Sequence, residues 1–157
     1  MDDLDIALIR LLLEEPRAGM REYARILGVA RGTVQSRLTR LEQDGVIGSF
    51  APRISPALLG YPVLAWVNLQ LAQGRLEEVA RFVESIPEAL EAHTIAGGDG
   101  DLMCRVVARD NEHLEEVIQQ FIKLPGVVRT QTQIVLRERV GYRVLPLVTL
   151  AGKRGRS

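Results

Sequence analysis

The order of apolar patterns in the second half of the chain is the feature that most restricts its fold. A strand-like stretch spans residues 63–71, and helical and strand-like patterns then alternate as far as residue 136. We expect strands at residues 63–71, 90–96, 102–109 and 127–136 and helices at residues 76–85 and 111–124. This βαββαβ order predicts a ferredoxin-like, four-stranded antiparallel sheet with both helices on one face. The chain is therefore expected to be an α+β protein.

The first expected strand indicates what the uncovered face of this sheet carries. Successive side chains of a strand point to opposite faces. One face of residues 63–71 is wholly apolar, whereas the other is mixed and carries Trp66, the only tryptophan of the chain. A mixed face with a large aromatic residue is typical of subunit interfaces, although a solvated face with an incidental tryptophan is an alternative. We expect this face to form a homodimer interface.

Three short amphipathic helices are expected before the sheet domain. The first has Asp2 as its N-cap, with Asp5 as the second residue of a capping box, and it ends before Pro16. The second covers residues 20–27 and stops at Gly28, and the third covers residues 31–44 and is closed by Gly45. Such a trio predicts a small helical bundle.

Proline and glycine mark the boundary between the two parts. The segment from residue 49 to residue 62 cannot be a continuous helix, because it contains three prolines and Gly60. The segment after residue 140 ends in GKRGRS and is expected to be mobile and weakly basic. The predicted organisation is a helical domain at residues 1–48, a hinge at 49–62, a sheet domain at 63–140 and a tail at 141–157.

Charge is unevenly distributed, although the formal net charge of the chain is zero. Residues 17–53 hold seven basic and three acidic side chains, which gives a net charge of +4. Residues 54–140 hold eight basic and twelve acidic side chains, which gives −4. Overall neutrality argues against a polyanionic partner, but this distribution indicates a basic module joined to an acidic one.

The second and third helices form a helix-turn-helix pattern. In such a motif the second helix of the pair enters the major groove of DNA and offers polar and basic groups to bases and phosphates. Here Val34, Leu38 and Leu41 mark the buried face of that helix. A solvated helix that binds nothing explains the spacing equally well. The candidate DNA-binding residues are Arg31, Gly32, Thr33, Gln35, Ser36, Arg37, Arg40 and Arg53.

A loop rich in glycine and aspartate, AGGDGDLM, lies between two expected strands at residues 96–103. A calcium or magnesium loop requires more oxygen ligands than Asp99 and Asp101 supply. A phosphate cradle requires a helix after the glycines, whereas a strand is expected here. A hairpin with Asp99 and Gly100 as a type I′ turn explains the composition by itself, without excluding a binding function.

Other classes of protein receive little support from the sequence. Cys104 is the only cysteine, which excludes an internal disulfide and a cysteine-based zinc cluster. An enzyme with Cys104 as nucleophile and His93 or His113 as base is a weak alternative, since a strand cysteine more often serves as a small apolar residue. No basic and apolar leader follows Met1, and no apolar run reaches about 18 residues. We expect a cytoplasmic protein that is not an enzyme, binds no metal or cofactor and does not span a membrane.

Three segments carry a resemblance to a known family. They read LDIALIRLLLEEPR, REYARILGVARGTVQSRLTRLEQDGVIGSFAPRISPALLGY and, before the last strand, LPGV. Together with the βαββαβ order they resemble the Lrp/AsnC (feast/famine) family of bacterial and archaeal transcription regulators, over roughly residues 1–136. The most specific part is residues 27–47.

The resemblance implies a winged-helix-like DNA-binding domain, a hinge and a RAM- or ACT-like domain that senses a small effector. It also implies dimers that assemble into octamers or similar rings on double-stranded DNA, with imperfect palindromes as operators. The effector is expected to be an amino acid, bound in the family by the loop that Gly98, Asp99, Gly100 and Asp101 resemble. A sensing module that binds little or no DNA is the alternative.

The chain departs from the family pattern at two places. Ala30 and Arg31 stand where the family commonly has serine and proline, so the usual serine N-cap of the recognition helix is missing. We expect Arg31 to contact a phosphate or a base edge instead. Leu102 follows the effector loop where an aromatic residue is common in the family, which puts the identity of the effector in doubt.

Overall fold

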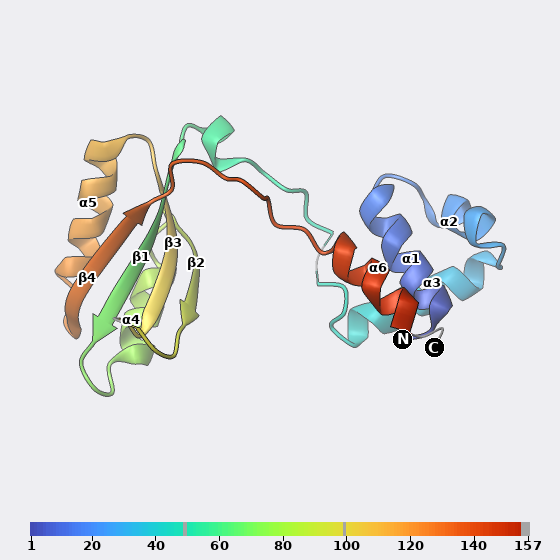
Figure 1. The fold of residues 1–157 in the computed structure, drawn as a ribbon, viewed down its shortest axis with the longest axis horizontal. Helices are drawn as coiled ribbons and strands as arrows, with labels where there is room; N and C mark the ends of the chain where they lie inside the picture. The colour runs from blue at the N-terminus through green and yellow to red at the C-terminus, as the bar shows by residue number, and fades with distance from the viewer. Residues whose placement is uncertain (49, 99, 155–157) are drawn as a thin grey trace. The chain divides into compact units, whose positions relative to one another are not determined.

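The structure is a computed structural model that describes residues 1–48, 50–98 and 100–154. The chain forms two compact units. The helical unit contains Met1–Pro52 and the segment that begins at Val140, and the sheet unit contains Arg53–Arg139. The chain therefore passes between the units twice, once before and once after the sheet (Figure 1).

The helical unit begins with the three predicted helices. The capping box is confirmed: Asp2 accepts a hydrogen bond from the Asp5 backbone N–H and Asp5 accepts one from the Asp2 backbone N–H, both at 2.9 Å. The helices are α1 (Asp3–Glu14), α2 (Met20–Leu27) and α3 (Arg31–Gln43). They enclose a core of Leu8, Tyr23, Ala24, Val34, Leu38 and Leu41.

Glycines set the ends of α2 and α3, as the sequence predicts. Gly28 follows α2 with a φ of 66°, and Gly45 follows α3 with a φ of 70°, a left-handed conformation that other residues adopt at a cost. At the start of α3, Ala30 occupies the N-cap position and makes no side-chain capping hydrogen bond. The short turn between Gly28 and Arg31 brings α2 and α3 together as a helix-turn-helix.

A further helix, α6 (Leu145–Arg154), lies in the segment that the sequence analysis describes as a mobile tail. That prediction is wrong for these residues, because α6 packs against α1 in the helical unit (Figure 1). Val148 is buried there, and a Cβ built on Gly152 would lie 3.0 Å from Ile6 Cγ2. Contact with α1 therefore favours a helix in a segment whose Pro146 and Gly152 make its own helical propensity low.

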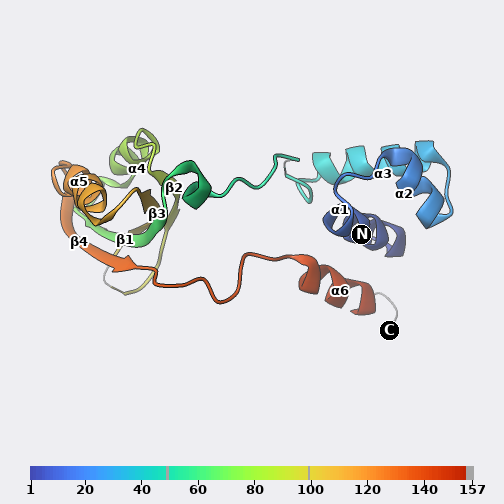
Figure 2. The ribbon, with the colours of Figure 1, turned by 90° about the horizontal axis from the view of Figure 1, so that it is seen from above.

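The sheet unit has the predicted βαββαβ order. Its elements are a short 3₁₀ helix η1 (Pro56–Leu59), β1 (Val63–Leu71), α4 (Leu76–Glu84), β2 (Ala89–Thr94), β3 (Leu102–Ala108), α5 (Asn111–Ile122) and β4 (Val127–Ile134). The strands form one antiparallel sheet in the order β2-β3-β1-β4. Both helices cover the same face (Figure 2). The expected α+β fold is confirmed, with α4 and α5 over a buried apolar core.

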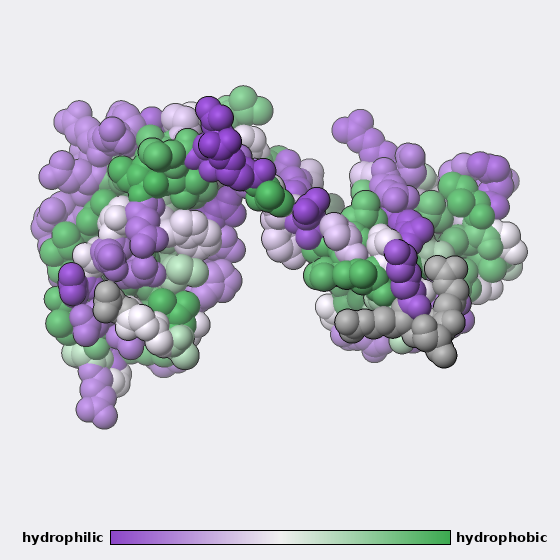
Figure 3. Space-filling model, in the orientation of Figure 1, coloured by the Kyte–Doolittle hydropathy of each residue, from purple (hydrophilic) through white to green (hydrophobic). Residues whose placement is uncertain are grey.

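The other face of the sheet is open to its surroundings in a single chain. Ala65, Val67 and Leu69 of β1 are buried under the helices, and the residues between them lie on this open face. Trp66 lies there between Arg105 of β3 and Gln133 of β4. Figure 3 views this side of the sheet unit and shows hydrophobic and hydrophilic side chains intermixed. The alternation predicted for the first strand is confirmed.

Candidate nucleic-acid and effector sites

The exposed surface of α3 is the candidate DNA interface. Val34, Leu38 and Leu41 are buried, as the helical spacing predicts. Residues 31–33, 35 and 36 are exposed, and none of residues 31–36 is acidic. Five of the predicted DNA-binding residues lie on this surface, namely Arg31, Gly32, Thr33, Gln35 and Ser36.

Two further residues belong to this surface that the sequence analysis missed. Thr39 and Gln43 are exposed, and with Gly32 and Ser36 they follow the spacing i, i+4, i+7 and i+11. This spacing places all four on the side of α3 that points away from the buried leucines. The helical periodicity contained the signal, although the predicted set omits both residues.

Arg37 and Arg40 do not have the orientation that the sequence analysis expects. Instead of pointing away from the bundle, their guanidinium groups bind the acidic N-terminus of α1. Arg37 Nη1 contacts the carboxylates of Asp2 and Asp5, the latter at 3.0 Å. Arg40 Nη2 donates to both oxygens of Asp5, at 2.7 and 2.6 Å. Helical periodicity gives no sign of these contacts, because they join residues that lie 32 to 35 positions apart.

We call the group formed by Asp2, Asp5, Arg37 and Arg40 the acid–arginine cluster. Hydrogen bonding from the Arg37 guanidinium and the Asp5 backbone lowers the pKa of Asp2 to about 2. Burial by itself would raise the pKa of Asp5, but the Asp2 backbone N–H and Arg37 outweigh it, and the net direction is down. Both carboxyl groups are therefore ionised at neutral pH, and the cluster is neutral as a whole.

Arg53, the last predicted DNA-binding residue, is exposed but belongs to the sheet unit. It is therefore not part of the α3 surface. Among residues 31–36, the exposed first half of α3, the basic residue is Arg31.

The glycine-rich loop is longer than the predicted two-residue turn. The Ile95 N–H donates to the Asp101 carbonyl at 3.0 Å, so the loop spans residues 96–100. This register does not fit a two-residue hairpin turn, and the predicted type I′ turn itself falls on Asp99. Gly97 and Gly98 have φ values of 88° and 79°, which lets the chain reverse here without side-chain strain. Asp99 lies outside the described residues.

Asp101 fastens this loop to the end of β1. Its N–H donates to the Leu69 carbonyl at 2.8 Å, and its Oδ2 accepts from the Leu71 N–H at 2.7 Å. Gly100 fits closely against the strand, since a Cβ at this position would lie 3.3 Å from the Asn68 Cβ. The loop thus holds a carboxylate and exposed glycine backbone beside the end of β1. A carboxylate suits an ammonium group, and glycine N–H groups suit a carboxylate.

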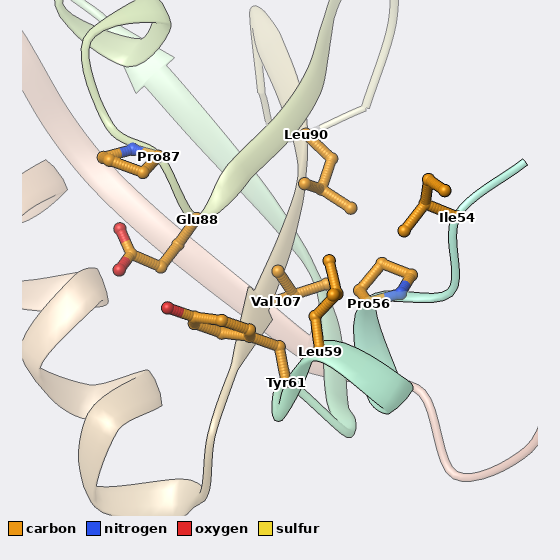
Figure 4. A pocket seen from close by; sticks show the side chains of 8 residues that line it. All are labelled: Ile54, Pro56, Leu59, Tyr61, Pro87, Glu88, Leu90 and Val107. Carbon is orange, nitrogen blue, oxygen red and sulfur yellow. The ribbon is translucent and has the colours of Figure 1, made fainter. Parts of the chain in front are cut away.

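A cavity of about 330 Å³ lies elsewhere in the sheet unit. Figure 4 shows the Tyr61 hydroxyl and the Glu88 carboxylate on one side of it, with apolar side chains around the rest. Glu88 Oε1 lies 3.4 Å from His113 Nε2, and His113 Nδ1 accepts from the Arg109 N–H at 3.1 Å. The lining residues described by the structure include no cation, so this cavity suits the carboxylate of an amino acid less well than the loop does.

The described part of the chain offers little support for a metal site or a nucleophilic cysteine. It contains no group of three or more histidine, cysteine or acidic side chains positioned to hold a metal ion. Cys104 is fully buried, and burial raises its pKa to about 11, so that it stays a thiol at neutral pH. No helix within residues 1–48, 50–98 and 100–154 combines the length and apolar character needed to cross a membrane.

Comparisons with known proteins cover both units. Residues 1–47 match the model of a winged helix-turn-helix DNA-binding family, and residues 64–145 match the Lrp/AsnC ligand binding domain. The HTH-type transcriptional regulator FL11 of Pyrococcus horikoshii is 31% identical over 147 residues, which cover 94% of this chain and 97% of FL11. The regulator Ptr1 of Methanocaldococcus jannaschii is 30% identical over 138 residues, which cover 87% of this chain and 93% of Ptr1.

Solved structures have the same fold. AsnC of Escherichia coli superposes with a TM-score of 0.85 at 26% identity and covers 93% of this chain and 99% of its own. A transcriptional regulator of Neisseria meningitidis, crystallised in complex with L-Met, has a TM-score of 0.85 at 24% identity and covers 96% and 99%. At 24% identity, the similarity to the Neisseria meningitidis regulator shows a common fold alone.

Proposed function

Because this chain belongs to the Lrp/AsnC family of DNA-binding transcriptional regulators, we propose that it reads operator DNA as a homodimer whose binding is modulated by an amino acid. The observation that carries the DNA part of this proposal is the exposed, acid-free first half of α3 in a helix-turn-helix. Regulation then requires that the effector bind one state of the protein better than the other.

Five residues of the α3 surface have roles that their chemistry supports. Arg31 would bind a phosphate or the O6 and N7 atoms of guanine, and Gln35 would bind an adenine edge or a phosphate. Gly32 would let the helix approach the backbone closely, while Thr33 and Ser36 would donate to phosphates. Arg53 would add a phosphate contact from outside α3.

Selection of bound sequences from random double-stranded DNA tests the DNA-binding part. A homodimer with two copies of α3 should enrich imperfect palindromes whose half-sites lie one helical turn, roughly 34 Å, apart. The selection should be run at low and at physiological salt. A pool that shows no enriched sequence at either salt concentration would contradict the proposal.

We assign the effector to the loop that contains Gly98, Asp99, Gly100 and Asp101. Oδ2 of Asp101 is bound to Leu71, which leaves Oδ1 to accept from the ammonium group of an amino acid. Glycine N–H groups of the loop would receive its carboxylate. The complex of the Neisseria meningitidis relative with L-Met supports an amino acid as the class of ligand.

Calorimetric titration with each amino acid tests this assignment, and two variants of one residue separate charge from structure. Asp101→Asn keeps an acceptor for the Leu71 N–H but loses the charge, whereas Asp101→Ala loses both. We expect both variants to bind the effector at least about tenfold more weakly, which is a loss of about 1.4 kcal/mol. If no amino acid produces heat, or if Asp101→Asn binds as the parent does, the loop is not the effector site.

We propose that the open sheet face, with Trp66, forms the dimer interface and that dimers assemble further into octamers or similar rings. The mixture of hydrophobic and hydrophilic side chains on this face supports a dimer interface there. Light-scattering mass measurement should give a dimer or a multiple of it, and a Trp66→Glu variant should shift the protein toward monomers. A monomeric parent protein at micromolar concentration would refute this assembly.

We infer no catalytic role for the chain. Cys104, the strongest candidate nucleophile, is buried and held as a thiol, which supports a packing role. We also place its activity in the cytoplasm, where a prokaryotic regulator meets the chromosome, and assign it no metal or cofactor.

A further inference from the structure

The acid–arginine cluster is an unexpected feature of a unit that binds DNA. Acidic side chains repel phosphates, yet Asp5 lies with its side chain only 1% exposed at the point where α1 meets α3. It binds Arg37 at 3.0 Å and Arg40 at 2.6 Å, and Asp2 binds Arg37 as well. Two of the three arginines on α3, Arg37 and Arg40, are therefore engaged in ion pairs within the protein.

Asp5 is buried, whereas the side chains of Arg37 and Arg40 are 26% and 49% exposed, so we expect these ion pairs to contribute little net stability. Removing charges from water costs free energy that the ion pairs recover only partly. A guanidinium group is planar and binds a carboxylate in a restricted set of directions, so two arginines on one carboxylate restrict rotation of the helix that carries them. Arg37 and Arg40 lie at i and i+3 on α3, and Asp5 is the N3 residue of α1.

The N-terminus of α1 is itself held in place by the capping box. Asp2 and Asp5 exchange backbone hydrogen bonds of 2.9 Å, which orients both carboxylates before they meet the arginines. The rotation of α3 about its axis is therefore determined at two places, by the buried leucines on one side and by the acid–arginine cluster on the flank.

We propose that Asp5 is a positioning residue for DNA recognition: it holds Arg37 and Arg40 against α1, so that α3 presents Gly32, Ser36 and Thr39 to the groove. It also keeps these two arginines from binding phosphates without regard to sequence. This inference rests on the proposed function, since it presumes that α3 reads DNA. Arg37 and Arg40 then act on specificity through geometry, and Arg31 supplies direct contact.

The proposal predicts a result opposite to that of simple electrostatics. Replacing an acid by its amide should strengthen binding to all DNA if charge alone mattered. For Asp5→Asn we instead expect binding to the selected operator to weaken about tenfold, while binding to unrelated DNA strengthens. The salt dependence for unrelated DNA should steepen by about 0.9 for each arginine that reaches a phosphate.

Asp3→Asn is the matched control. Asp3 also lies in the first turn of α1 and carries the same charge, but it is exposed, and no contact with an arginine is recorded for it in the described part of the chain. It should strengthen binding to operator and unrelated DNA alike. The variants are compared by fluorescence anisotropy at several salt concentrations, after circular dichroism has verified that each is folded.

Arg40→Gln gives a second test that does not depend on the folding of Asp5→Asn. A positioning role predicts weaker operator binding with an unchanged salt slope, whereas a phosphate contact predicts a slope reduced by about 0.9 per subunit. The proposal is overturned if Asp5→Asn behaves as Asp3→Asn does, or if Arg40→Gln reduces the slope. Failure of the parent protein to bind any DNA would instead overturn the proposed function.

Discussion

At the scale of single residues, the carboxyl group of Asp2 makes the stability of the helical unit depend on pH. Its pKa falls from 3.8 to about 2, mainly because it accepts hydrogen bonds from Arg37 and the Asp5 backbone. The folded value is below the unfolded one, so the stabilisation is complete above pH about 4 and is lost as pH falls through about 2. Asp2→Asn should therefore lower the melting temperature at pH 6 and have no effect below about pH 2. Melting curves that differ equally at both pH values would show that ionisation of Asp2 is not responsible.

The N-cap of α3 offers a stabilising substitution at the same scale. Ala30 has an extended conformation, with φ −66° and ψ 146°, but no side-chain acceptor for the free N–H groups of the first turn. Ala30→Ser should stabilise the helical unit by about 1 kcal/mol. Ala30→Val provides no acceptor and serves as the control. Chemical unfolding followed by circular dichroism measures the difference, and a serine variant no more stable than the parent would contradict the expectation.

How far single residues could be predicted depended on the range of their contacts. The capping box and the glycines at positions 28 and 45 act within a few residues, so the sequence was enough to identify them. The partners of Arg37 and Arg40 come from another helix, and an exposed-looking arginine at a helical spacing gives no sign of them. The sequence therefore predicted the exposure of α3 near Arg31 but not the ion pairs of Arg37 and Arg40, and contact of these residues with DNA stays a prediction.

At the scale of elements, α6 yields a prediction about packing. Val148 is 8% exposed where α6 contacts α1, whereas Leu147 beside it is 64% exposed. Val148→Ala should destabilise the helical unit by about 2 kcal/mol, since it leaves a cavity against α1. Leu147→Ala should have little effect on the same unfolding transition. Equal effects of the two substitutions would mean that α6 does not depend on this contact.

The elements of the sheet unit were predictable because their patterns are local. The bounds expected for β1 are those observed, and the other strands and both helices agree within two residues. Alternation of apolar residues in β1 predicted which face the helices cover. The helix α6 and the register of the chain between β2 and β3 were missed, because the first depends on contact with α1 and the second on contacts of Gly100 and Asp101 with β1.

At the scale of the whole molecule, Trp66 reports on assembly. It is the only tryptophan and lies on the proposed dimer interface, partly exposed in a single chain. Dilution that separates dimers should move its fluorescence emission to longer wavelength, in step with the fall in mass seen by light scattering. An emission maximum that stays constant while the mass halves would place the interface elsewhere.

The division of charge predicted from the sequence also belongs to this scale. The basic residues 17–53 lie almost entirely in the helical unit, and the acidic majority lies in the sheet unit. This distribution of charge favours approach of DNA to the helical unit, in line with the proposed DNA interface on α3. The return of the chain to the helical unit after Arg139 was not predicted, since its signal is a tertiary contact.

The central claim is that the first half of α3 binds DNA, and the salt dependence of operator binding by Arg31→Ala tests it most directly. Arg81→Ala, which removes an exposed arginine from α4 of the sheet unit, is the control. We expect weaker binding by Arg31→Ala and a slope of log K against log salt reduced by about 0.9 per subunit, with Arg81→Ala unchanged. Identical affinity and slope for Arg31→Ala and the parent protein would contradict it.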